Sequence, residues 1–205
     1  MSPKIFSCLA ALLLATAAAE ARPVQTTTYK YYPIKGTNVS QVYASMIKRG
    51  PDVHGDSAYA ATAATSSQSG KLVQGKTCRI EDYRFKIDFV VKLPRLSNEK
   101  ALNSETLANW RRFQQFLKAH EDHHRQIWLG CAAGLEAKVK TMTAPDCQTL
   151  DRRATKLWKD MQASCTRQHQ AFDAAEQRRV LRHPFVRQVI RQMSKHNNAL
   201  TISVD

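Results

Sequence analysis

One apolar stripe constrains the fold of this chain more than any other feature, because it keeps helical spacing from residue 107 to residue 139. Apolar, aromatic and histidine side chains recur there every three or four positions, which predicts a single helix of about ten turns over residues 104–139. The stripe consists of Leu107, Trp110, Phe113, Leu117, His120, His124, Ile127, Cys131, Leu135 and Val139. A second helical stretch over residues 147–182 follows Pro145. A short connection between two long helices favours an antiparallel hairpin.

The residues before the long helix have the spacing of strands. Residues 83–93 alternate apolar and polar side chains with a period of two, which is typical of a strand with one buried face. We also expect a strand over 29–34 and a short helix over 39–48, whereas the Ala/Ser/Thr-rich residues 58–69 fit either a loop or a strand. The predicted class is α+β, with a small antiparallel sheet and a short helix followed by the helical hairpin.

The first residues resemble a secretory signal peptide. Residues 1–4 are basic, residues 5–19 are apolar or small, and A-x-A patterns permit cleavage after Ala19 or Ala21. The apolar run is shorter than the about 20 residues that span a bilayer, and no later stretch is long and apolar enough. We therefore expect residues 1–21 to be removed and the mature protein to be periplasmic or extracellular, with no transmembrane segment.

The mature chain is predicted to form one domain and a short extension. Residues 22–183 form the domain, whose β-rich half is 22–95 and whose helical half is 103–183. Residues 184–205 are expected to be a basic amphipathic C-terminal extension, in which Pro184 fits the first turn of a helix.

The chain is strongly basic. It has 31 Lys and Arg against 17 Asp and Glu, a formal net charge of +14, and the leader takes away one base and one acid. Such a charge suggests anionic partners. Export argues against nucleic acid, so an anionic envelope surface facing the basic helices is the expected partner of this kind.

The cysteines fit an oxidising compartment. Of five cysteines, Cys8 lies in the leader, which leaves an even number in the mature chain. Export favours two disulfides, for which three pairings are possible. The alternative, a zinc site made of four cysteines, is disfavoured because no two of them have C-x-x-C spacing.

The chemical motif is His120-Glu121-Asp122-His123-His124, which contains H-E-x-x-H on the long helix. Residues four apart lie on one helix face, so His120 and His124 could bind one zinc ion. Glu121 is rotated by about 100° around the axis, where it could act as the general base. The motif predicts a zinc-activated water and a zincin-like site, while a solvated histidine-rich patch is the alternative.

With these motifs the chain resembles a family of bacterial predicted secreted zinc-dependent proteases, formally a domain of unknown function. The matching segments are Tyr31-Tyr32-Pro33-Ile34-x-Gly36, Gly50-Pro51, Cys78-Arg79, Leu93-Pro94-Arg95, His120-Glu121-Asp122-x-His124-Arg125 and Cys147. The resemblance implies zinc ligation by His120 and His124 and catalysis by Glu121. It also suggests a Cys78–Cys147 disulfide, which leaves Cys131 and Cys165 as the second pair.

The third zinc ligand is less well defined by the sequence. Asp173 matches an Asp of the family pattern, but the position of a downstream family His is occupied here by Arg178. If the hairpin turns between residues 143 and 144, His124 lies level with about residue 163 on the return helix. Asp173 is the favoured ligand on the pattern match, and the alternatives are His169, which is nearest in level, His183 and Glu176.

The function predicted from these features is hydrolysis of peptide or related amide bonds by an exported metallopeptidase with one zinc ion. Its partner would be a peptide or protein substrate. Two alternatives remain. One is a non-catalytic exported protein that keeps the fold and binds an anionic envelope component through its basic helical face, and the other is a purely structural disulfide-linked protein.

Overall fold

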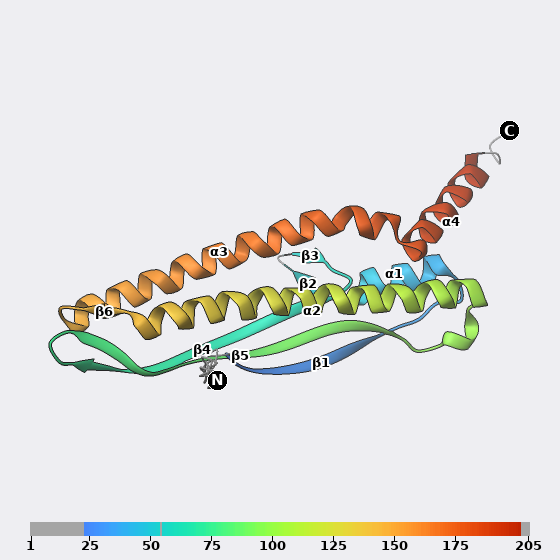
Figure 1. Cartoon of the computed structure of the whole chain (residues 1–205). Coiled ribbons are helices and arrows are strands. Elements are labelled where there is room, and N and C mark those ends of the chain that lie inside the picture. The colour runs from blue at the N-terminus through green and yellow to red at the C-terminus, as the bar shows by residue number, and fades with distance from the viewer. Residues whose placement is uncertain (1–22, 54, 202–205) are drawn as a thin grey trace, which may run out of the picture.

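The computed structural model describes residues 23–53 and 55–201 (Figure 1). The predicted signal peptide, residues 1–21, lies outside the described residues. The elements in chain order are β1 (Val24–Ile34), α1 (Val39–Arg49), β2 (Asp52–Val53), β3 (Asp56–Ser57), β4 (Ala61–Gln74), β5 (Cys78–Leu96), the 3-10 helix η1 (Glu99–Ala101), α2 (Ser104–Thr141), β6 (Thr143–Ala144), α3 (Cys147–Arg182) and α4 (Pro184–Thr201). The α+β class is confirmed.

The main sheet has the strand order β1-β5-β4, with β6 paired to the start of β5. The antiparallel pairing expected for the sheet is present between β4 and β5. β1 pairs with β5 in parallel, so the sheet is mixed. The Ala/Ser/Thr-rich segment forms most of β4, which resolves the choice between loop and strand. β2 and β3 form a separate two-stranded ribbon.

The strand alternation of β5 determines which face of the sheet the helices cover. Its apolar side chains are buried, while Arg84, Lys86 and Lys92 on the other face are exposed. The buried set is Tyr83, Phe85, Ile87, Phe89, Val91 and Leu93. α2 packs on the sheet and runs along its strands, and α3 runs back alongside α2 (Figure 1).

Both long helices begin at side-chain caps. The Asn103 side chain accepts a hydrogen bond from the Thr106 backbone N–H, and the Asp146 side chain does the same for Thr149. Such caps satisfy backbone donors that have no partner within the helix. α2 has 38 residues and α3 has 36, and the antiparallel hairpin that they form confirms the expectation from the stripes.

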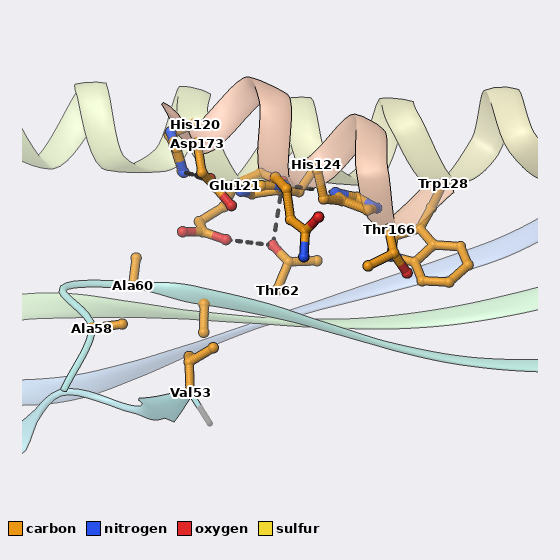
Figure 2. Close-up of a pocket in the computed structure, with 13 residues that line it drawn as sticks. Val53, Ala58, Ala60, Thr62, His120, Glu121, His124, Trp128, Thr166 and Asp173 are labelled. Atoms are coloured by element: carbon orange, nitrogen blue, oxygen red, sulfur yellow. Dashed lines mark hydrogen bonds and ion pairs between the residues drawn. The ribbon is translucent and has the colours of Figure 1, made fainter. Parts of the chain in front are cut away.

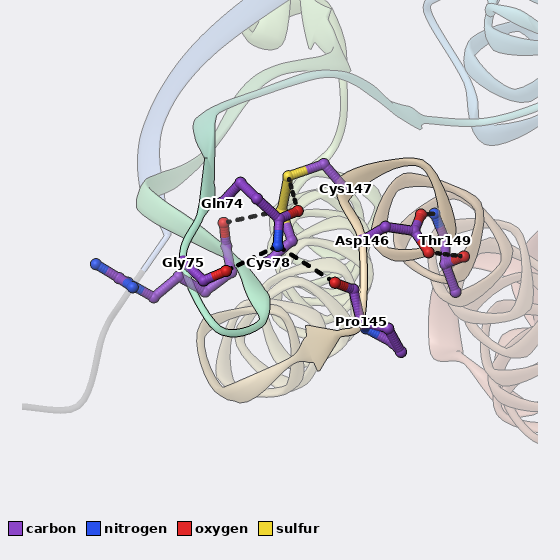
Figure 3. Close-up of a disulfide and its surroundings, with 8 residues drawn as sticks. Gln74, Gly75, Cys78, Pro145, Asp146, Cys147 and Thr149 are labelled. Carbon is purple, nitrogen blue, oxygen red and sulfur yellow. Dashed lines mark hydrogen bonds between the residues drawn. A yellow bond between two sulfur atoms is a disulfide. The ribbon is translucent and has the colours of Figure 1, made fainter.

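Two disulfides attach α3 to its neighbours. Cys78–Cys147 joins the start of β5 to the start of α3 (Figure 3). Cys131–Cys165 joins α2 to α3. Both pairs are those that the family resemblance implies, so the expected disulfide pairing is confirmed. Beside the first bridge, the amide of Gln74 donates to the carbonyl of Pro145 at 3.2 Å.

The C-terminal helix belongs in part to the core. Phe185, Val186 and Val189 are buried in a cluster with Trp110 of α2 and residues of α1. The first half of the predicted extension therefore packs on the domain. Among the described residues, no helix is both long enough and apolar enough to cross a membrane.

Candidate metal centre

Three side chains meet where α3 runs past the middle of α2. His120 Nε2 and His124 Nε2 are 3.1 Å apart, and Asp173 Oδ1 lies 3.2 Å from the first and 3.0 Å from the second. They are the only His, Cys, Asp or Glu side chains of the described residues that converge in this way. The two histidines share a face of α2 because they are four residues apart.

The dimensions of this triangle fit a tetrahedral zinc ion. Ligand atoms at about 2.0 Å from a tetrahedral zinc lie about 3.3 Å from one another, close to the three distances here. Three acceptor atoms in mutual contact repel one another unless a proton or a cation lies among them. Two imidazole nitrogens and a carboxylate oxygen are also a donor set that zinc commonly binds.

The surroundings of His120 and His124 favour the neutral form of both imidazoles, which is the form that binds metals. Burial lowers the pKa of His120 and of His124, and the Asp173 carboxylate opposes this shift only in part. A neutral imidazole has a free lone pair, which a metal requires. The second ring nitrogen of His124, Nδ1, lies 2.8 Å from Nδ1 of His169. A partner of this kind fixes the orientation of a ligating ring.

Glu121 lies next to this cluster and is buried, with 4% of its surface exposed. Its carboxylate oxygen Oε2 accepts a hydrogen bond of 2.8 Å from the Thr62 hydroxyl on β4. Burial is the main reason why the pKa of Glu121 rises to about 7, and the nearby carboxylates of Asp173 and Asp122 add to it. The Thr62 bond favours the charged form and opposes the rise.

Aromatic side chains hold the histidine rings in place. The Phe172 ring lies 4.7 Å from the ring of His120, 4.1 Å from that of His123 and 5.1 Å from that of His124. His169 packs against Trp128, with ring centroids 5.4 Å apart. The rings therefore have few rotamers open to them, which favours a preformed cluster.

The cluster opens into a cleft of about 520 Å³ between the helices and the sheet (Figure 2). Small side chains just before and at the start of β4 form one side, and the His, Glu and Asp groups of α2 and α3 form the other. The lining residues are Val53, Ala58, Ala60, Ala61, Thr62, His120, Glu121, His124, Trp128, Thr166, His169, Gln170 and Asp173.

The other candidate ligands lie elsewhere. His169 Nδ1 contacts Nδ1 of His124, whereas Asp173 contacts Nε2 of the same ring. His183 packs against Phe113 and Phe116, and its Nδ1 accepts a hydrogen bond from the Phe185 backbone N–H. Glu176 is paired with Arg179 at 2.6 Å. Of the four candidates, Asp173 is the one whose carboxylate contacts both His120 and His124.

The roles of Thr62 and Phe172 were missing from the sequence-based prediction. Thr62 lies in an Ala/Ser/Thr-rich run in which no residue differs chemically from its neighbours. The hydrogen bond that brings Thr62 into the site is made with Glu121, which lies 59 positions away in the sequence. Phe172 directly precedes the candidate ligand Asp173 in the sequence, and this adjacency could have predicted that its ring lies close to the site.

A polar network on the opposite side of α2 fixes this helix to β1. The Asp122 carboxylate accepts hydrogen bonds from the Tyr29 hydroxyl at 2.6 Å, from Lys118 at 2.5 Å and from Arg125 at 2.9 Å. Arg125 also lies over the ring of Phe89 on β5, 5.4 Å from its centroid. The helix that carries the histidines is thus fixed to two strands.

Replacing Asp122 with asparagine is expected to lower the free energy of unfolding by about 1–2 kcal/mol, because the half-buried Arg125 and the exposed Lys118 lose their charged acceptor. Urea denaturation followed by circular dichroism measures this change. The matched control is Asp160→Asn, whose pair with Lys156 on α3 is exposed and should contribute less than about 0.5 kcal/mol. Equal effects of the two substitutions would contradict a structural role of the Asp122 network.

The described residues thus define an α+β protein with a two-histidine, one-aspartate cluster on a disulfide-linked helical hairpin. The chain belongs to the family described as Bacterial protein of unknown function (DUF922), which matches residues 29–180. No curated protein and no solved structure matches the chain.

Proposed function

We propose that this protein is an exported zinc-dependent metallopeptidase that hydrolyses peptide or related amide bonds. The observation that carries the proposal is the triangle of His120, His124 and Asp173 beside the buried carboxylate of Glu121. The three donor atoms lie 3.0 to 3.2 Å apart. All four side chains line one cleft.

We infer the role of each residue from its position in the cluster. His120, His124 and Asp173 would hold one zinc ion, which would polarise a substrate carbonyl and lower the pKa of a bound water to about 7. Glu121 would take the proton from the attacking water and deliver it to the leaving amine. The Thr62 hydroxyl holds the Glu121 carboxylate at the cleft through its 2.8 Å hydrogen bond.

The cleft also offers a place for an extended substrate. β4 is an edge strand, and its first residues line the cleft opposite Glu121. A peptide could pair with the free backbone groups of this edge, since sheet edges recognise extended peptides by main-chain hydrogen bonds. The small side chains of Ala58, Ala60 and Ala61 leave room for such a peptide.

Export after removal of residues 1–21 is part of the proposal. The two disulfides support it, because disulfides persist in the periplasm and outside the cell and are rare in the cytosol. An oxidising compartment would keep the helical hairpin linked while the cleft is open to envelope or extracellular proteins.

The purified protein is expected to bind one zinc ion, and Asp173→Ala should weaken this binding by at least about 100-fold, more than the loss of a supporting residue costs. Equilibrium competition with a chromogenic chelator measures the affinity, and elemental analysis gives the stoichiometry. Asp151→Ala, an exposed change of the same kind on α3, is the control and should leave zinc affinity unchanged.

Failure of the wild-type protein to bind zinc after metal reconstitution would refute the metallopeptidase. Unchanged affinity in Asp173→Ala would instead assign the third ligand elsewhere. Variants of His169, His183 and Glu176 would then identify it.

A further inference from the structure

The C-terminal helix α4 combines exposed apolar residues with exposed basic residues. From Gln177 to Val204 the sequence contains six Arg or Lys and no Asp or Glu: Arg178, Arg179, Arg182, Arg187, Arg191 and Lys195. Arg187, Arg191 and Lys195 are exposed on α4 and form no ion pair with another described residue.

The apolar stripe of α4 continues beyond the point where the domain ends. Phe185, Val186 and Val189 are at most 5% exposed in the core, whereas Ile190 is 48% exposed and Met193 is 53% exposed. At 100° per residue, Met193 lies about 80° from Phe185, within the same stripe. α4 extends away from the other helices at an angle to α3 (Figure 1).

The basic residues lie on a neighbouring side of the same helix. Arg187, Arg191 and Lys195 follow each other at four-residue spacing, so they form a row about 130° from the centre of the Ile190 and Met193 side. A helix with an apolar side, a basic side and low overall hydrophobicity is suited to lie in the interface of an anionic lipid bilayer.

We propose that α4 docks the protein onto an anionic lipid surface, with Ile190 and Met193 inserted among the acyl chains and the basic row on the head groups. This inference does not depend on zinc or on catalysis. Its function would be to hold the cleft close to the membrane, where envelope proteins are concentrated.

Two features favour lipid over the other possible occupants. A second copy of the chain would bring its own acid-free α4 and a net charge of +14 against the first, so like charges would face each other. A soluble anionic polymer would satisfy the basic row but would leave Ile190 and Met193 in water. A bilayer with anionic head groups satisfies both sides of the helix.

Sedimentation with vesicles tests the proposal. The purified protein should bind vesicles of equal parts phosphatidylglycerol and phosphatidylcholine, and should bind vesicles of phosphatidylcholine alone on the order of 100-fold more weakly. Each basic residue near an anionic surface strengthens binding about fivefold, so Arg187→Gln/Arg191→Gln/Lys195→Gln should lose a similar factor. Ile190→Ser/Met193→Ser should lose about tenfold or more, because its apolar contacts are gone.

The matched control is Lys138→Gln/Lys159→Gln/Arg167→Gln, which removes the same charge from exposed positions of α2 and α3. It should keep most of the vesicle binding, and circular dichroism should show all variants folded. Equal losses in the two triple variants would overturn the proposal, because net charge alone would then explain binding. Binding that is insensitive to Ile190→Ser/Met193→Ser, or a dimer in sedimentation velocity that this variant dissociates, would overturn it as well.

Discussion

Replacing Glu121 with glutamine is expected to lower the hydrolytic rate by roughly 10²–10⁴-fold, the usual contribution of a general base. The amide keeps the shape of the side chain and can still contact the Thr62 hydroxyl, but it cannot accept a proton from water. Zinc content should stay at one ion per chain, because Glu121 is not among the three converging donors. A mixture of fluorogenic peptides gives the activity, and elemental analysis gives the zinc content.

Glu105→Gln is the control for this experiment. Glu105 is an exposed glutamate in the first turn of the same helix, so its substitution makes the same change in charge away from the cleft. Full activity of Glu121→Gln would show that this carboxylate is not the base. Stoichiometric zinc in a wild-type protein without hydrolytic activity would favour the alternative of a binding protein that keeps the metal.

Replacing both Cys78 and Cys147 with alanine is expected to lower the free energy of unfolding by about 4 kcal/mol. The bridge closes a loop between residues 69 positions apart, and the entropy that it removes from the unfolded chain grows with the logarithm of that separation. Urea denaturation under non-reducing conditions measures the loss.

Gln74→Ala is the control for the disulfide experiment, because it removes an exposed side chain that contacts Cys147 Sγ and leaves the bridge intact. It should change stability by less than about 1 kcal/mol. A double-alanine variant as stable as the wild type would mean that the unfolded chain is already constrained by the second bridge, Cys131–Cys165.

The sequence predicts the elements whose burial has a regular period. The stripe of α2 and the alternation of β5 each place one side in the core, so the patterns predict helix and strand correctly. β4 is different, because most of its side chains are exposed and small, which gives no period to detect. The parallel pairing of β1 with β5 depends on how the chain returns through α1 and β4, which no local pattern encodes.

The candidate site is predicted to the extent that it lies on one helix. His120, Glu121 and His124 follow from helical spacing, whereas Asp173 depends on the register between two helices. Equal rise from a turn between residues 143 and 144 places residue 163 level with His124. In the structure the residue that contacts His124 is His169, which is six residues or about 9 Å further along α3. The extended residues 142–146 cause this shift, since they carry the chain past the end of α2 before α3 begins.

The second disulfide fixes the register between α2 and α3 by a covalent bond. Cys131 lies seven residues after His124 and Cys165 lies eight residues before Asp173, about two turns from the converging donors on each helix. A slip of one helical turn, 5.4 Å, would carry Asp173 away from both imidazoles. We therefore expect the chain to acquire an ordered donor set only after oxidation, so that a precursor in a reducing compartment would neither collect metal nor act on its neighbours. The positions of Cys131 and Cys165 on the hairpin would therefore determine that oxidation precedes metal loading during biogenesis.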